Sequence, residues 1–152
     1  MGSRLVTALL ASVALGALGL AACGSGAEDE YKDDFPLLSR EIVSLGQEVG
    51  DSIQTAAEST DRELAEDFDR FARELGDIRS ELDELEPPDE LADEQDELEA
   101  AMRDVQGPLQ DIADAAEESD PEAARLATEE LVQRSADLRE ARRELARAVD
   151  EL

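Results

Sequence analysis

Apolar side chains recur along most of this chain at alternating steps of four and three residues. In residues 61–86 this spacing continues without a polar interruption through Leu64, Phe68, Phe71, Leu75, Ile78, Leu82 and Leu85. Such spacing places the side chains on one face of an α-helix, in the a and d positions of a heptad. Residues 61–86 are therefore predicted to form an amphipathic helix that buries this face.

The same spacing predicts helices over residues 89–118 and 121–152, with one polar member in each stripe, Gln95 and Arg134. Polar side chains at heptad core positions often fix the register of neighbouring helices, which is the role expected for both. Residues 36–58 carry a looser stripe formed by Leu38, Ile42, Leu45, Val49, Ile53 and Ala56. No segment alternates with a period of two, so no β-sheet is expected.

The predicted helix boundaries coincide with residues that stop or start helices. Pro87 and Pro88 end the second helix because proline lacks an amide hydrogen and restricts the residue before it. Asp120 and Pro121 form an N-cap and first-turn proline for the last helix. Thr60 and Glu63 match a capping box.

Two all-α architectures follow from the capping box at Thr60. If the chain turns there, residues 36–152 form a single domain, an up-down-up-down four-helix bundle with coiled-coil-like packing. If it does not turn, residues 36–85 form one long first helix in a three-helix arrangement. We favour the turn, because otherwise the apolar face of residues 36–58 would lack a partner of equal length.

The N-terminus has a different composition. Arg4 precedes an uncharged apolar run over residues 5–20, which is the layout of a secretory signal. The run is shorter than the roughly 20 residues that a transmembrane helix needs. It ends in Leu20-Ala21-Ala22-Cys23, which resembles the lipobox of bacterial lipoproteins.

This resemblance covers residues 1–23 and implies a specific processing route. Cleavage falls between Ala22 and Cys23, residues 1–22 are removed as a signal peptide, and a diacylglycerol is attached to the Cys23 thiol. The protein would then be extracytoplasmic and anchored to a bacterial membrane by acyl chains. The choice between an inner and an outer membrane stays open. Residues 23–35 are expected to form a flexible acidic tether, because small and charged residues dominate them.

Charge and residue types limit the function. Loss of Arg4 with the signal peptide would leave 13 basic and 41 acidic side chains, a net charge of 13 − 41 = −28. This charge argues against a nucleic-acid partner, because phosphate contacts need basic stripes. It is also compatible with a simple adaptation to solubility or salt. The chain has no His and only one Cys, which excludes Ser-His-Asp and Cys-His catalysis. We expect no enzyme activity and no cofactor.

The candidate binding residues are four arginines on the last predicted helix: Arg139, Arg142, Arg143 and Arg147. Like charges at this spacing repel one another, so we expect carboxylates on neighbouring helices to neutralise them. Alternatively, they could bind an anionic envelope polymer or the acidic patch of a partner protein. On the third helix, Gly107-Pro108 predicts a bend, which could also open a gap between helices.

A cluster of acidic residues surrounds Pro87-Pro88 and consists of Glu81, Asp83, Glu84, Glu86, Asp89 and Glu90. Carboxylates can bind Ca²⁺ or Mg²⁺, but EF-hand spacing is absent and a solvated acidic turn is the simpler interpretation, so no metal site is assigned.

The leading hypothesis is a lipid-anchored, non-catalytic interaction or scaffold module of the cell envelope, with an unknown envelope protein or polymer as partner. The alternative is a divalent-cation-responsive or cation-buffering surface protein. Heptad stripes serve coiled coils between chains as readily as an internal core, so the oligomeric state stays open.

Overall fold

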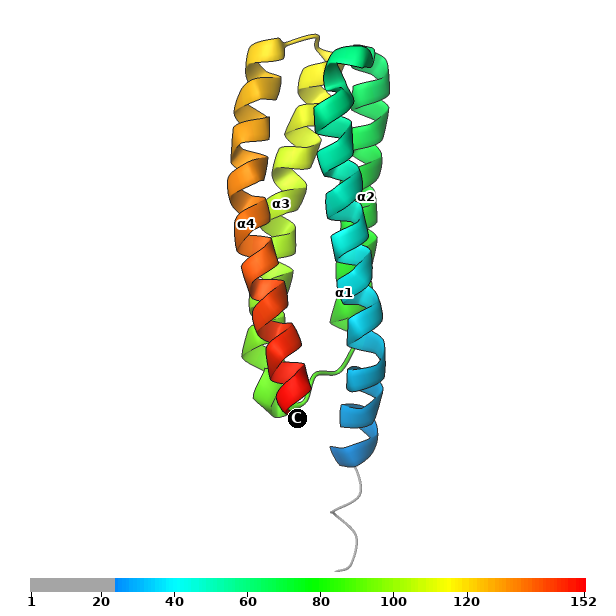
Figure 1. Cartoon of the computed structure of the whole chain (residues 1–152), viewed down its shortest axis with the longest axis vertical. Coiled ribbons are helices and arrows are strands. Elements are labelled where there is room, and N and C mark those ends of the chain that lie inside the picture. Colours follow the sequence, from blue (N-terminus) through cyan, green and yellow to red (C-terminus); the bar gives the residue numbers. More distant parts are fainter. Residues whose placement is uncertain (1–23) are drawn as a thin grey trace, which may run out of the picture.

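The computed structural model describes residues 24–152, with side chains from Glu28 onward, and this part of the chain is an all-α four-helix bundle without strands (Figure 1). Four long helices and two short 3-10 turns follow one another in the order α1 Gly24–Thr55, η1 Ala56–Glu58, α2 Asp61–Glu84, η2 Asp89–Leu91, α3 Ala92–Glu117 and α4 Pro121–Glu151. The predicted four-helix bundle is confirmed.

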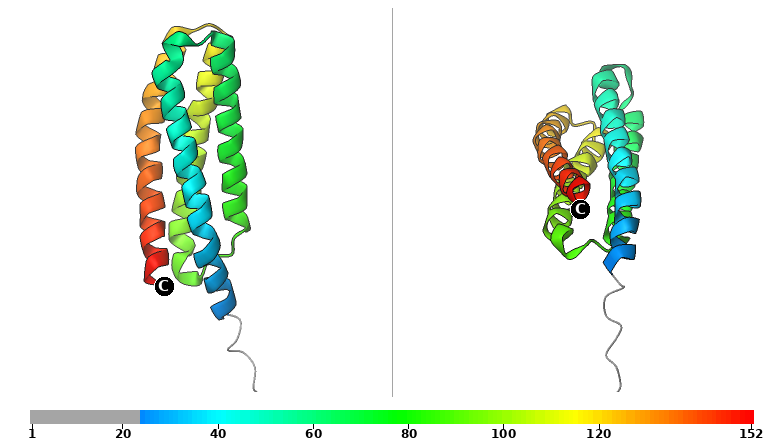
Figure 2. Two further views of the ribbon diagram at one scale, coloured as in Figure 1. Left: turned by 45° about the vertical axis from the view of Figure 1, so that its right-hand side comes forward. Right: turned by 60° about the horizontal axis from the view of Figure 1, so that its bottom comes forward.

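The helices run alternately up and down with short connections, as the spacing of their breaks predicts. The start of α1, the connection from α2 to α3 and the end of α4 lie at one end of the bundle, and the other two connections lie at the opposite end (Figure 1). Helix α3 packs most extensively, against both α2 and α4, whereas α1 lies beside α2 and α4 with fewer contacts (Figure 2).

The turn at Thr60 excludes the arrangement with one long first helix. Thr60 Oγ1 accepts a hydrogen bond from the backbone N–H of Glu63 at 3.3 Å, and the Glu63 carboxylate accepts one from the N–H of Thr60 at 2.9 Å. The Thr60 hydroxyl also donates to this carboxylate at 2.8 Å, and the hydrogen bonds from the N–H and the hydroxyl of Thr60 lower the pKa of Glu63. The predicted capping box is therefore present and begins α2.

The core follows the predicted heptad stripes. Their buried members include Phe68, Phe71, Leu75, Ile78 and Leu82 of α2 and Leu98, Met102, Val105, Leu109 and Ile112 of α3. Helix α4 contributes fewer large side chains to the core, namely Leu131, Leu138, Leu145 and Val149. Its polar stripe member, Arg134, is half-exposed and reaches Asp104 of α3 at 3.5 Å, so it lies at the edge of the core.

Gln95 is the buried polar member of the α3 stripe, and it holds the start of α1 in place. Its side-chain oxygen accepts a hydrogen bond from the hydroxyl of Tyr31 at 2.7 Å, and its amide nitrogen donates to the carbonyl of Leu82 at 3.1 Å. Gln95 therefore links three helices through one side chain. This contact fits the predicted role in fixing register.

The prediction of a flexible tether over residues 23–35 is wrong for the described residues. Helix α1 begins at Gly24, and Tyr31 and Phe35 are each only 1% exposed. Their rings lie parallel with centroids 5.9 Å apart. A proline inside a helix, here Pro36, costs about 3 kcal/mol. Burial of each aromatic side chain contributes about 1.5–3 kcal/mol, which offsets that cost and docks residues 28–35 on the bundle.

Asp120 caps α4, as predicted. Its carboxylate accepts hydrogen bonds from the backbone N–H groups of Glu122 and Ala123, both at 3.0 Å. We expect Asp120→Ala to lower the free energy of unfolding by about 1 kcal/mol, because these N–H groups lose their acceptor. Urea denaturation measures the loss. Asp120→Asn keeps an acceptor oxygen and should lose much less; equal losses in both variants would contradict a capping role.

Candidate ligand-binding groove

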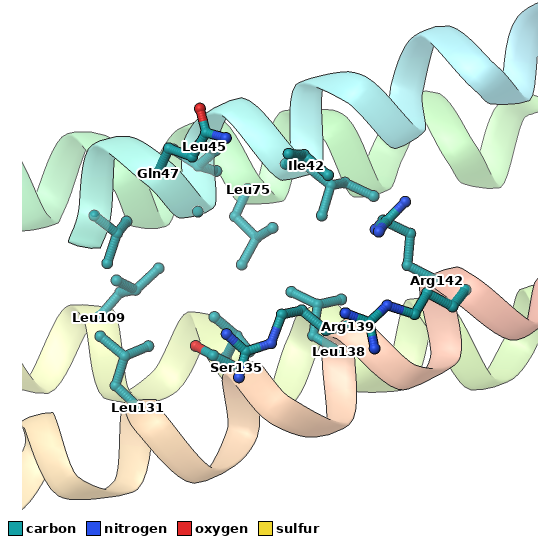
Figure 3. A pocket seen from close by; sticks show the side chains of 15 residues that line it. Ile42, Leu45, Gln47, Leu75, Leu109, Leu131, Ser135, Leu138, Arg139 and Arg142 are labelled. Carbon is teal, nitrogen blue, oxygen red and sulfur yellow. The ribbon is translucent and has the colours of Figure 1, made fainter. Parts of the chain in front are cut away.

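An apolar groove of about 340 Å³ opens between α1 and α4 (Figure 3). All four helices contribute apolar side chains to it: Ile42, Val43, Leu45 and Val49 from α1, Leu75 from α2, Val105 and Leu109 from α3, and Leu131 and Leu138 from α4. Figure 3 shows Leu75, Leu109 and Leu131 pointing into the space between the helices. This space is called the α1–α4 groove below.

Small side chains on the two facing helices keep the groove open. Gly46 of α1 and Ser135 of α4 both line it. A Cβ atom added at Gly46 would meet no atom within 4 Å. The antiparallel register set by Ser39 and Arg142 places Gly46 and Ser135 at about the same height, so neither helix offers a large side chain there.

Three of the four predicted arginines gather at the groove. Arg139, Arg142 and Arg143 line it together with Ser135 and Gln47. Arg142 reaches from α4 toward α1 (Figure 3), and its Nη1 atom donates a hydrogen bond to the hydroxyl of buried Ser39 at 2.9 Å. The arginines therefore lie toward the end of the groove near Ser39, whereas Ser135 and Gln47 are the uncharged polar residues farther along it.

The expected neutralisation by carboxylates of neighbouring helices is wrong for the three arginines that line the groove, Arg139, Arg142 and Arg143. Among the side chains that the structure describes, none of the four cations of α4 named above forms an ion pair. Other arginines do pair with acids, as Arg62 does with Glu66 and Arg125 with Glu122 and Glu129. The reason is local: the α1 edge that lines the groove carries Val43, Gly46 and Gln47, none of which is acidic.

Arg147 lies outside the α1–α4 groove. It lines a separate depression with the acidic residues Asp93, Glu94, Glu97, Glu144 and Glu151. These carboxylates offset its charge without a direct ion pair. Arg147 also shares a second surface depression with Arg139, Glu140 and Arg143. The four arginines are therefore neighbours, and Arg147 is the one that does not line the groove.

The segment Gly107-Pro108 runs behind the groove. Helix α3 continues through Pro108, which is buried. Val105 and Leu109, on either side of this segment, form part of the groove floor. Sequence reasoning named both the arginines and this segment, but it did not bring them to one site.

The acidic turn around Pro87-Pro88 has no grouped ligand set. Within residues 24–152 the structure places no three His, Cys, Asp or Glu side chains where they could hold one metal ion. The cation-responsive hypothesis therefore lacks a defined site in this part of the chain, and it stays a prediction.

Comparison with known proteins adds no family to this picture. No protein-family model, curated protein or solved structure matches the chain. None of the described helices is long and apolar enough to cross a membrane. Ala22 and Cys23, the predicted cleavage and lipid-attachment residues, lie outside the described residues. The lipobox-like sequence and the α1–α4 groove are therefore the features of the chain that bear on its function.

Proposed function

We propose that this chain is a lipid-anchored, extracytoplasmic lipoprotein of a bacterial cell envelope that acts as a non-catalytic binding module. The anchor follows from Leu20-Ala21-Ala22-Cys23 and the apolar run before it. Two or more acyl chains make such an attachment stable. Because α1 begins at Gly24, the bundle would start directly after the acylated residue.

The α1–α4 groove is the observation that carries the binding role. Ligand sites are typically concave and mostly apolar, with a few polar groups that orient the ligand, and have volumes of roughly 300–1,000 Å³. The groove, at about 340 Å³, fits this description. Arginine is the only ionisable residue type among its lining residues, and arginine keeps its proton in proteins. The groove is therefore better suited to holding a ligand than to transferring protons.

We expect Cys23→Ala to abolish acylation and leave the protein at the size of its precursor. The thiol is the only acceptor for the diacylglycerol, and cleavage of such precursors follows lipid attachment. Labelling of growing cells with a radioactive fatty acid, followed by gel electrophoresis, measures both effects. Ser25→Ala, just downstream of the lipobox-like sequence, should be processed normally. A Cys23→Ala protein that is acylated and of mature size would refute the anchor.

Crosslinking in intact cells tests the interaction role separately. The native protein is recovered after crosslinking, and its covalent neighbours are identified by mass spectrometry. A reproducible envelope protein crosslinked to α1 or α4 would support a module that recruits a protein. If no neighbour is found, the scaffold role fails and binding of a small ligand is the role that stands.

A further inference from the structure

We propose that the α1–α4 groove binds a single-chain anionic amphiphile of the fatty-acid class. The acyl chain lies between α1 and α4, and the carboxylate lies at Arg139, Arg142 and Arg143. This inference rests on the proposed binding function and names the ligand class for it. It depends on four features of the groove: its apolar interior, its unpaired cations, its dimensions and its distance from the membrane anchor.

The interior of the groove is suited to an apolar ligand. Protein interiors are packed to the density of organic crystals, and voids larger than a water molecule are few. Leu75, Leu109 and Leu131 are each at most 2% exposed, yet they line a space of about 340 Å³. Water would bind only weakly in this space, because a water molecule in a cavity needs several polar partners. An acyl chain would fill this space without leaving polar groups unpaired.

The arginines at the groove favour a ligand with an anionic group. The chain has an excess of acidic residues, yet Arg139, Arg142 and Arg143 form no ion pair with any described side chain. Arginine binds carboxylates through paired hydrogen bonds of fixed geometry. Arg142 is already oriented across the seam by its hydrogen bond to Ser39. A carboxylate at this end of the groove would form the direct ion pairs that no described side chain forms with these arginines.

The dimensions fit one acyl chain. Arg142 and Leu131 bound the groove on α4 and lie about 16 Å apart along the helix, at 1.5 Å per residue. That length suits a medium-length chain running from the arginines to the apolar end. The volume is near the lower limit of ligand pockets, so a lipid with two chains is the poorer fit.

The acyl chains proposed on Cys23 do not reach the groove. Ile42, at the near end, lies about 27 Å along α1 from Gly24. Each leaflet of a bilayer contributes about 15 Å to a hydrocarbon core of about 30 Å, so a lipid tail is shorter than the required distance. The occupant is therefore a separate molecule.

Photocrosslinking in isolated membranes tests this inference on the native, lipidated, full-length protein. The probe is a medium-chain fatty acid with a photoreactive group in its chain, and washed membranes lack the ATP needed to convert it into other lipids. Peptide mass spectrometry locates the labelled residues. The matched control probe is the amine with the same chain. We expect the acid to label the groove segments of α1 and α4, and the amine to label them about tenfold less, as expected for losing a charged hydrogen bond.

Two matched pairs of variants separate groove binding from general effects. Gly46→Leu places a side chain in the groove and should remove the labelling, whereas Ala100→Leu adds a leucine on the exposed face of α3, away from the groove, and should leave the labelling unchanged. Arg142→Gln should reduce labelling about tenfold, whereas Arg62→Gln, on the exposed start of α2, should not change it.

Three results would overturn the inference. These are labelling spread evenly over the chain, equal labelling by acid and amine, or equal labelling of Gly46→Leu and Ala100→Leu. Crosslinks between two copies through the groove, in place of lipid labelling, would show that the groove is a protein interface. The anchor is read out independently by membrane attachment, so a protein that stays membrane-bound but unlabelled disproves only the ligand assignment.

Discussion

Replacement of Phe35 by alanine is expected to lower the free energy of unfolding by about 3–5 kcal/mol, the usual cost of deleting a buried aromatic side chain. Phe35 is 1% exposed and stacks on Tyr31, which holds the first part of α1 against the core. The loss includes both the transfer of the ring to water and the cavity left behind. Chemical denaturation followed by far-ultraviolet circular dichroism measures it.

Leu37→Ala is the matched control for Phe35→Ala. Leu37 is on the same helix but is 50% exposed, so its removal should change stability by less than about 0.5 kcal/mol. If Phe35→Ala cost no more than Leu37→Ala, residues 28–35 would not be docked on the bundle.

Ionisation of Tyr31 is expected to unfold the protein progressively in alkali. Burial raises the pKa of the Tyr31 hydroxyl, and the nearby Glu99 carboxylate acts in the same direction. The folded state therefore holds this proton more tightly than the unfolded state, whose tyrosine titrates near pH 10. The stabilisation that comes from the protonated Tyr31 hydroxyl is fully present below about pH 10. It falls above that pH by about 1.4 kcal/mol per pH unit, until the pKa of the folded state is reached.

The chain suits this measurement because it has one tyrosine and no tryptophan. Ultraviolet absorbance of the ionised phenol thus reports Tyr31 alone, and denaturation at several alkaline pH values gives the stability. Tyr31→Phe removes the titrating group and should flatten the pH dependence. If wild type and Tyr31→Phe lost stability in parallel above about pH 10, burial of the Tyr31 hydroxyl would not be its cause.

The helices with regular stripes and strong caps were predictable from local chemistry. Thr60 and Asp120 are caps that depend only on residues within one helical turn. The start of α1 was predicted incorrectly, because the small and charged residues before residue 36 were interpreted as a tether. The spacing of Tyr31 and Phe35 continues the stripe of Leu38 and Ile42 backward with the same alternating steps. That periodicity was the available signal.

The groove was less accessible to sequence reasoning. The arginines were identifiable, but their lack of partners depends on which α1 residues face them. The uncharged positions Val43, Gly46 and Gln47 gain meaning only when α1 and α4 are placed side by side. A heptad pattern defines the buried face of each helix, but it does not give the width of the seam between two helices. Gly46 and Ser135 widen this seam because they lie opposite each other, and that placement depends on how α1 and α4 pack.

The helical start of α1 restricts how far the protein can reach from its proposed anchor. A flexible segment of twelve residues would let the bundle sample a sphere with a radius of roughly 20 Å, whereas a helix from Gly24 holds Ile42 about 27 Å from that end. The effective concentration of one tethered molecule near another depends on how well the length of the tether matches the distance between their binding sites. With Cys23 acylated, the groove would meet only partners or ligand carriers that present themselves at that height above the membrane.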